Sequence, residues 1–326
     1  MSADFLTMTL VALCDALAAK RLSPVDLMHA TLARIEATNA DLNAVVALRD
    51  RDALFADARA AEERISGGKA RPLEGIPLGV KDLEDTEGLV TSQGSLPLRD
   101  NIATRDSIQV GRLKAAGAIV VGKTNAPEFG HTAITKNLLF GTTRSPWNLD
   151  RTPGGSSGGS SAAIAACVLP LATASDGGGS IRIPASFTGT FGLKTSFGRV
   201  PRGRAAHWEF GDTSVYGPLT KTVEDAALVL DQTAGVSPYD PNSLPDPGLS
   251  YLEAVRGNCP PGLRIGFSPD LGYAVVQSDI AAAVEDAVKV FAKLGHRVTG
   301  VPGGPPQLGR EWGILGAFEL ATHLHP

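Results

Sequence analysis

Apolar and polar positions along this chain fall into blocks that predict helices and strands in turn. Ser23-Pro24-Val25-Asp26 is a strong helix start, with a serine cap, a proline in the first turn and an early acid. Two short apolar runs, Ile76–Val80 and Ala118–Val121, are typical of buried strands. Further helices are expected over 8–19, 50–65, 107–117, 160–168, 223–233, 278–294 and 314–324, and further strands over 42–48, 169–174, 263–268 and 296–301. This alternation predicts an α/β layered domain.

One such domain is expected over residues 1–326, with a mainly helical N-terminal part over residues 1–66. A length of 326 residues would suggest two domains at about 150 residues each, but large α/β enzymes often form a single one. Apolar residues make up 43% of the chain, which is ample for a core.

Charge and composition exclude several classes of protein. The net charge is −4 and there is no basic block, so nothing indicates nucleic-acid binding. No stretch reaches the ~18 apolar residues that span a membrane, and the N-terminus lacks the basic region of a signal peptide. The three cysteines, Cys14, Cys167 and Cys259, are widely spaced and form no metal or redox motif. A cytoplasmic protein with no cofactor and no metal is therefore expected.

Two glycine-rich turns that carry serines are the strongest chemical signal in the sequence. The first is Gly154–Ser161 and the second is Asp176–Pro184. Successive backbone N–H groups in such turns can form a nest that binds negative charge. Ser180 is therefore the candidate nucleophile, because an oxyanion formed there would meet N–H groups already in place. The N–H groups of Ser180 itself and of three glycines would form this oxyanion hole: Gly177, Gly178 and Gly179.

A serine nucleophile needs a base, and Lys81 is the candidate. The six histidines lie in no familiar hydrolase context: His29, His131, His207, His296, His323 and His325. Lys81 follows the apolar run Ile76–Val80, where burying a charge costs free energy and therefore indicates a functional role. Burial would have to lower its pKa from about 10.4 towards about 7–8. The next residue, Asp82, would point to the opposite face of the strand.

These segments resemble the amidase signature enzymes. That family is marked by Gly-Gly-Ser-Ser-Gly-Gly followed by Asp-x-Gly-Gly-Ser-Ile-Arg-x-Pro, and every fixed element occurs between Gly154 and Pro184. Gly79-Val80-Lys81-Asp82 matches the family's upstream lysine segment. The separations also agree, with 75 residues from Lys81 to Ser156 and 24 from Ser156 to Ser180. The resemblance runs from about residue 22 to about residue 294 and implies a large mixed, twisted β-sheet with helices on both faces.

The resemblance implies an amidase that hydrolyses a linear or cyclic carboxylic amide through a Ser–cisSer–Lys triad and an acyl-enzyme. Lys81 would accept a proton from Ser156, and Ser156 one from Ser180. Asp176 and Arg182 would brace the second turn as an ion pair. The implied partners are a small-molecule amide and, for assembly, a second copy in a homodimer, with neither nucleic acid nor membrane involved.

The resemblance also bears on the substrate and on the bridging serine. The residues before Ser180 are Asp-Gly-Gly-Gly, which look more like free-standing amidases than like the amidotransferase subunits that act on charged tRNA. Ser156 is assigned the bridging role from the resemblance, because spacing alone does not separate it from Ser157. Ser160 and Ser161 are further rivals.

Two other hypotheses remain open on the sequence. The resembled enzymes continue well past residue 326, so the main alternative is a catalytically inactive fragment with intact motifs. The remote alternative is nucleotide binding, because Gly117–Thr124 matches the phosphate-loop formula G-x-x-x-x-G-K-[ST], with Lys123 as its lysine. That formula needs a strand before the loop and a helix after it, whereas here the loop residues themselves are expected to form a strand. Lys194 is a rival to Lys81 as the base, but it has no matching role in the family.

Overall fold

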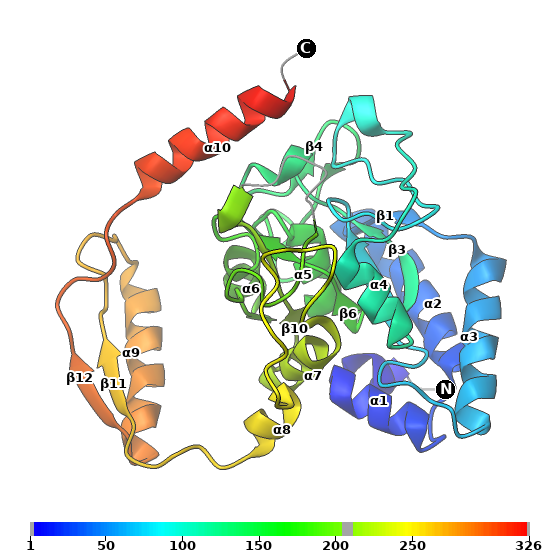
Figure 1. Ribbon diagram of the computed structural model, residues 1–326, viewed down its shortest axis with the longest axis horizontal. Coiled ribbons are helices and arrows are strands. Elements are labelled where there is room, and N and C mark those ends of the chain that lie inside the picture. Colours follow the sequence, from blue (N-terminus) through cyan, green and yellow to red (C-terminus); the bar gives the residue numbers. More distant parts are fainter. Residues whose placement is uncertain (1–2, 204–210, 325–326) are drawn as a thin grey trace. The chain divides into compact units, whose positions relative to one another are not determined.

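The computed structural model describes residues 3–203 and 211–324, and its internal contacts divide the chain into two compact units, Met1–Arg256 and Gly257–Pro326 (Figure 1). The first unit contains a mixed β-sheet between layers of helices, and the second is built on two parallel strands joined by a helix. The expectation of one domain over residues 1–326 stays a prediction.

The elements of the first unit follow the predicted alternation closely. Its α-helices are α1 (Leu10–Ala18), α2 (Pro24–Leu42), α3 (Arg51–Ser66), α4 (Ile108–Ala115), α5 (Gly158–Ala165), α6 (Arg182–Thr188), α7 (Val223–Thr233) and α8 (Tyr251–Arg256). Its strands are β1 (Val45–Leu48), β2 (Pro77–Lys81), β3 (Ile119–Thr124), β4 (Lys136–Asn137), β5 (Gly141–Thr142), β6 (Leu171–Ala172), β7 (Ser175–Asp176), β8 (Phe191–Gly192), β9 (Val215–Tyr216) and β10 (Leu219–Thr220). Short 3-10 helices are η1 (Ala3–Thr7), η2 (Leu96–Leu98), η3 (Glu128–Gly130) and η4 (Gly211–Thr213).

The helix predicted from the Ser23 cap is confirmed. Ser23 Oγ accepts a hydrogen bond from the backbone N–H of Val25 at 3.0 Å, and Pro24 is the first residue of α2. A serine cap of this kind satisfies one of the N–H groups that the first turn of a helix leaves without an internal partner. The helix ends at Asn43, whose left-handed backbone turns the chain towards β1.

The main sheet has six strands in the order β1-β3-β2-β6-β10-β8. The strands β3, β2 and β6 are parallel neighbours, whereas β1, β10 and β8 join antiparallel. This arrangement confirms the predicted mixed sheet with flanking helices. Because β2 lies between β3 and β6, the residue at its carboxyl end is surrounded by segments that lie far away in the sequence.

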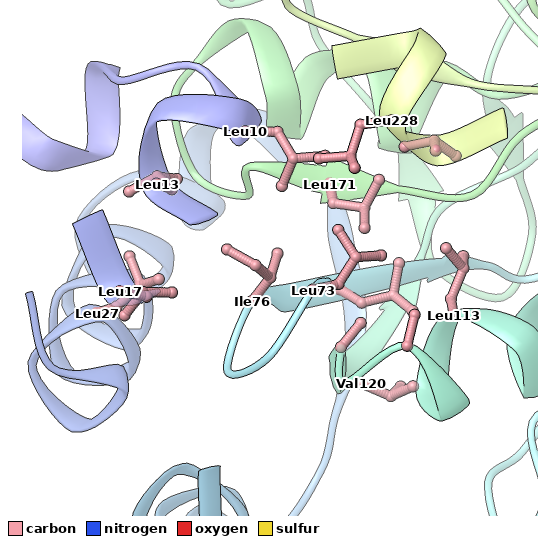
Figure 2. Close-up of a cluster of buried hydrophobic side chains, with 14 of the residues drawn as sticks. Leu10, Leu13, Leu17, Leu27, Leu73, Ile76, Leu113, Val120, Leu171 and Leu228 are labelled. Carbon is pink, nitrogen blue, oxygen red and sulfur yellow. The ribbon is translucent and has the colours of Figure 1, made fainter. Parts of the chain in front are cut away.

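Side chains of alternate residues on β2 and β3 pack into different clusters. On one face, Leu78, Val80 and Val120 pack with α1, α4 and α7, as Figure 2 shows for part of this cluster. On the other face, Ile119 and Val121 pack with α2, α3 and α5. Each fully buried leucine or valine contributes about 1.5–3 kcal/mol. Packing on the first face therefore stabilises the position of β2, and the side chain of Lys81 projects from the other face of this strand.

The structure contradicts the nucleotide-binding alternative. The residues that would form a flexible phosphate loop are strand β3, and the next helical segment is the three-residue η3 rather than a helix directly after Thr124. The Lys123 side chain is only 1% exposed, and its ammonium donates to the backbone oxygen of Glu84 and to Thr91 Oγ1. A lysine enclosed in this way is not available to a bound phosphate.

The second unit consists of β11 (Arg264–Phe267), α9 (Ser278–Lys293), β12 (Arg297–Gly300) and α10 (Gly309–Leu324). Its two strands are parallel, with Ile265 opposite Val298, and α9 supplies the crossover that a parallel pair requires. The predicted strand, helix, strand and final helix of this region are thus confirmed. Over the described parts of the whole chain, none of the helices combines the length and the apolar character needed to cross a bilayer.

Candidate active site

Strand β2 delivers Lys81 to the centre of the first unit. The side chain is fully buried, and its Nζ donates to Ser156 Oγ at 2.8 Å and to Ser175 Oγ at 2.9 Å. The backbone N–H of Lys81 donates to Thr173 Oγ1 at 2.9 Å. Lys81 thus lies between the two glycine-rich turns, because β6 pairs with β2 and leads directly into the second turn.

The first turn leads into α5, which begins at Gly158, and contains Ser156 and Ser157, which the sequence did not separate. Ser156 is 2% exposed, its peptide bond with Gly155 is cis, and its Oγ faces the Lys81 ammonium. Ser157 makes different contacts. Its Oγ donates to the backbone oxygen of Ser175 at 3.3 Å, and its N–H donates to the backbone oxygen of Ser180 at 3.2 Å. The geometry therefore gives the lysine contact to Ser156, while Ser157 holds the two turns together.

The other two serines of the first turn have structural contacts. Ser160 Oγ donates to the backbone oxygen of Thr173 at 2.8 Å and also contacts Thr124 Oγ1 at 2.7 Å. Ser161 Oγ donates to the backbone oxygen of Pro184 at 3.3 Å. Both side chains are buried and connect α5 to the neighbouring strands and to α6. These contacts are those of packing side chains rather than of a group that contacts Lys81.

The second turn is organised by the carboxylate of Asp176. The side chain of this residue is fully buried and accepts hydrogen bonds from the N–H groups of Gly179 at 2.7 Å and Ile181 at 3.2 Å. Arg182 forms a bidentate ion pair with Asp176, in which Nε and Nη2 each lie 2.9 Å from a carboxylate oxygen. Burial alone would raise the pKa of Asp176, but the Arg182 guanidinium and the two N–H groups outweigh it and hold that pKa below its ordinary value.

The contacts of Asp176 narrow the set of N–H groups in the predicted oxyanion hole. The N–H of Gly179 already donates to this carboxylate. Gly178 is exposed, and Gly177 and Ser180 are partly exposed. An oxyanion hole in this turn would therefore use the N–H groups of Gly177, Gly178 and Ser180 rather than that of Gly179.

Replacing Asp176 by asparagine should make the protein less stable and less sensitive to acid. A group with a depressed pKa stabilises the folded state above its unfolded pKa of about 3.9, and that stability is lost as the pH falls through the folded pKa. We expect Asp176→Asn to lose about 2 kcal/mol at pH 7, reduced from the cost for a fully buried pair because the Arg182 side chain is 54% exposed. Urea unfolding at pH 7 and between pH 5 and pH 2.5 measures both effects.

The control for this experiment is Asp100→Asn, which removes an exposed ion pair with Arg99. We expect it to leave both the stability and its acid dependence unchanged within about 0.5 kcal/mol. If the wild type and Asp176→Asn lost the same amount of stability on acidification, the lowered pKa of Asp176 would be contradicted.

Two residues of the site were missed by the sequence analysis. Ser175 is the second hydroxyl partner of the Lys81 ammonium, and Thr173 accepts the Lys81 backbone N–H. The sequence does contain a signal for them, because residues two apart on an extended segment point to the same face. Thr173 and Ser175, which follow β6, are therefore expected on the same side of the chain.

The rival Lys194 is exposed, and its Nζ donates to the backbone oxygen of Thr195 at 3.2 Å. Within the described residues, no group of three or more histidine, cysteine, aspartate or glutamate side chains is arranged to hold a metal ion.

The sequence model of a known protein family matches residues 26–317 of this chain. The model is that of the amidases. The chain belongs to the amidase family. Among the relatives of this amidase chain, an acylamidase from Rhodococcus erythropolis is 41% identical over 287 residues, which cover 86% of this chain and 59% of that protein. A glutamyl-tRNA(Gln) amidotransferase subunit from Pseudomonas fluorescens is 41% identical over 289 residues, which cover 88% of this chain and 59% of that protein.

Solved amidase structures confirm the fold. A bacterial aryl acylamidase of the amidase signature family superimposes with a TM-score of 0.89 at 33% identity, covering 97% of this chain and 66% of that one. A 6-aminohexanoate cyclic dimer hydrolase in complex with its substrate gives a TM-score of 0.87 at 31% identity, with the same coverage. This amidase chain thus spans about three fifths of the length of the relatives named above.

Proposed function

We propose that this chain carries the site of an amidase that cleaves carboxylic amides through Ser180, Ser156 and Lys81. The observation that carries the proposal is the 2.8 Å contact between Lys81 Nζ and Ser156 Oγ in a fully buried setting. A buried amine is driven towards its neutral form, which can accept a proton from a hydroxyl group. The relatives support the same interpretation, since an acylamidase and an aryl acylamidase are among them.

The first half of the proposed reaction forms an acyl-enzyme. Neutral Lys81 accepts a proton from Ser156, and Ser156 accepts one from Ser180. Ser180 Oγ forms a bond to the amide carbon, and the electron pair of the C=O bond moves to its oxygen. The resulting oxyanion is stabilised by N–H groups of the second turn, those of Gly177, Gly178 and Ser180. When the C–N bond breaks, the proton returns through Ser156 to the nitrogen, which leaves as ammonia or an amine.

The second half releases the acid. A water molecule passes its proton to Ser156 and on to Lys81, and its oxygen attacks the carbonyl carbon of the ester with Ser180. Collapse of the second oxyanion breaks the bond to Ser180 Oγ, and the relay returns the proton to that oxygen. Water and amide are thus converted into carboxylate plus amine, with the three side chains unchanged. No step uses a metal or an organic cofactor.

The substrate is proposed to be a small linear or cyclic amide. The aryl acylamidase and the cyclic dimer hydrolase are named for such molecules, and both superimpose over nearly the whole of this chain. The amidotransferase relative is also 41% identical in sequence. The Asp-Gly-Gly-Gly run before Ser180 favours the free-standing amidases, as the resemblance implied.

Reaction with a fluorophosphonate tests the proposal without knowledge of the substrate. Such a reagent phosphonylates a serine that is activated as a nucleophile beside an oxyanion hole. We expect one adduct per chain by intact mass, located on Ser180 after proteolytic digestion and fragmentation. An adduct on Ser156 or Ser157 would contradict the assignment of the nucleophile to the second turn. A folded chain with no adduct would favour the inactive fragment.

A further inference from the structure

Lys123 is a second buried lysine, and the proposed relay does not use it. It lies on β3 opposite Val80, whereas Lys81 lies opposite Thr124. Because partners in a register share a face, the two lysines project from opposite faces of the sheet. The Lys123 ammonium donates to the backbone oxygen of Glu84 and, at 2.9 Å, to Thr91 Oγ1. Burying a lysine this completely costs free energy, so the ammonium requires contacts that compensate for the lost water.

The charge that complements Lys123 is on Asp82, the residue after Lys81. This carboxylate accepts hydrogen bonds from the N–H of Ser92 at 3.0 Å, from the Ser92 hydroxyl, and from the N–H of Gly94 at 3.2 Å. Burial raises the pKa of Asp82, and the positive charge of Lys123 opposes that rise. Burial in turn lowers the pKa of Lys123 to about 8, against the pull of Asp82 and Glu84. Each charge therefore stabilises the other in the interior.

Together these two residues hold the segment 91–95 in one conformation. The Lys123 ammonium donates a hydrogen bond to Thr91 Oγ1, and the Asp82 carboxylate accepts hydrogen bonds from Ser92 and Gly94. Between them, Gln93 has a left-handed backbone with φ of 53°, which a residue other than glycine adopts only when its surroundings impose it. All five residues of the segment are buried, so neighbouring parts of the chain pack against it.

The loop 126–130 packs directly on that surface. Phe129 is also left-handed, with φ of 51°, and its N–H donates to the backbone oxygen of Gln93 at 2.9 Å. Ser95 Oγ donates to Glu128 Oε1 at 2.8 Å. Gly94 leaves room for this contact, since a Cβ there would lie 2.8 Å from the backbone oxygen of Ala126. The conformation of the loop therefore depends on the segment 91–95.

The far end of the loop reaches the bridging serine. Gly130 is buried against the first turn, and a Cβ at this position would lie 3.3 Å from Ser156 Oγ. The backbone of Gly130 thus forms one wall beside the hydroxyl that contacts Lys81. Any shift of the loop 126–130 changes the space in which Ser156 Oγ can turn.

We propose that Lys123, with Asp82, is a positioning residue that acts through the segment 91–95 and the loop 126–130 on Ser156. The lysine of the phosphate-loop-like motif thus supports the relay from the opposite face of the sheet. The inference rests on the proposed function, because it assigns Ser156 a part in the reaction. It explains why two charged side chains lie in the interior close to the end of β2.

Lys123→Met tests the proposal, because methionine keeps the length of the side chain and removes the ammonium. We expect the first-order rate of fluorophosphonate reaction at Ser180 to fall on the order of 10²-fold, the cost of a misplacement of about 1 Å. The concentration for half-maximal rate should change less than about threefold, since the reagent does not touch Lys123. Amide hydrogens of 92–94 and 128–130 should exchange faster with solvent. Thr91→Val, which removes one acceptor and conserves shape, should lower the rate about tenfold while the protein stays folded.

The matched control is Glu74→Gln, which removes another buried charge, one that pairs with the partly exposed Arg64 and Arg71 away from the segment 91–95. We expect it to lower the melting temperature and to leave both the reaction rate and the exchange at 128–130 within about threefold of wild type. Equal effects in Lys123→Met and Glu74→Gln would overturn the positioning role. A wild type without an adduct on Ser180 would instead count against the proposed function, and hydrogen exchange would still decide the positioning role.

Discussion

Ser180→Ala is expected to abolish amide hydrolysis by this chain, with a loss in kcat on the order of 10⁴–10⁶-fold. Removal of the proposed nucleophile would leave only the N–H groups of the second turn, and they cannot form an acyl-enzyme. The side chain of Ser180 is partly exposed, so its removal should change the melting temperature by less than about 2 °C. The measurement is steady-state turnover of whichever amide the wild type hydrolyses in a panel of linear, aryl and cyclic amides.

Ser186→Ala provides the control, because Ser186 is an exposed serine on α6, a few residues beyond Ser180. Its turnover should equal that of the wild type. If Ser180→Ala kept more than about 1% of wild-type kcat, the nucleophile would have to be another group, and an acyl-enzyme at Ser180 would be excluded.

Lys81→Met is expected to have the next largest effect, a loss in kcat on the order of 10³-fold. General-base catalysis by a positioned side chain contributes about 10²–10⁴-fold, and methionine fills the same space without a group that accepts protons. The substitution also leaves the hydroxyls of Ser156 and Ser175 without their buried donor, at a cost of about 1–3 kcal/mol each. Stability should therefore fall together with activity, although by different mechanisms.

Two measurements separate these effects. Urea unfolding gives the loss of stability, and kcat measured well below the melting temperature gives the loss of the proposed base. Lys194→Met is the matched control, because Lys194 is an exposed lysine that the sequence left as a rival. It should retain full activity and stability. Equal losses in the two variants, or wild-type kcat in Lys81→Met, would remove Lys81 from the mechanism.

Much of the fold could be predicted because it depends on local chemistry. The Ser23 cap, the apolar run before Lys81 and the alternation of helices and strands each reflect preferences of neighbouring residues. The short apolar run Ile119–Val121 could be recognised as a strand despite the phosphate-loop formula for a similar reason, since β-branched side chains favour extended backbone. The predicted strand over 169–174 proved too long, because only Leu171–Ala172 pair in the sheet before the chain turns towards Asp176.

The sequence by itself determined the chemical groups of the candidate site: two glycine-rich turns with serines, a lysine at the end of a buried strand, and their separations. Only the tertiary structure decided how these groups meet. Pairing of β2 with β6 brings Ser175 to Lys81, and the carboxylate of Asp176 engages the N–H of Gly179. Such contacts join residues that are distant in the chain or depend on the shape of a turn. The pattern of any one segment cannot specify them, because they arise from strand register and from packing on the opposite face.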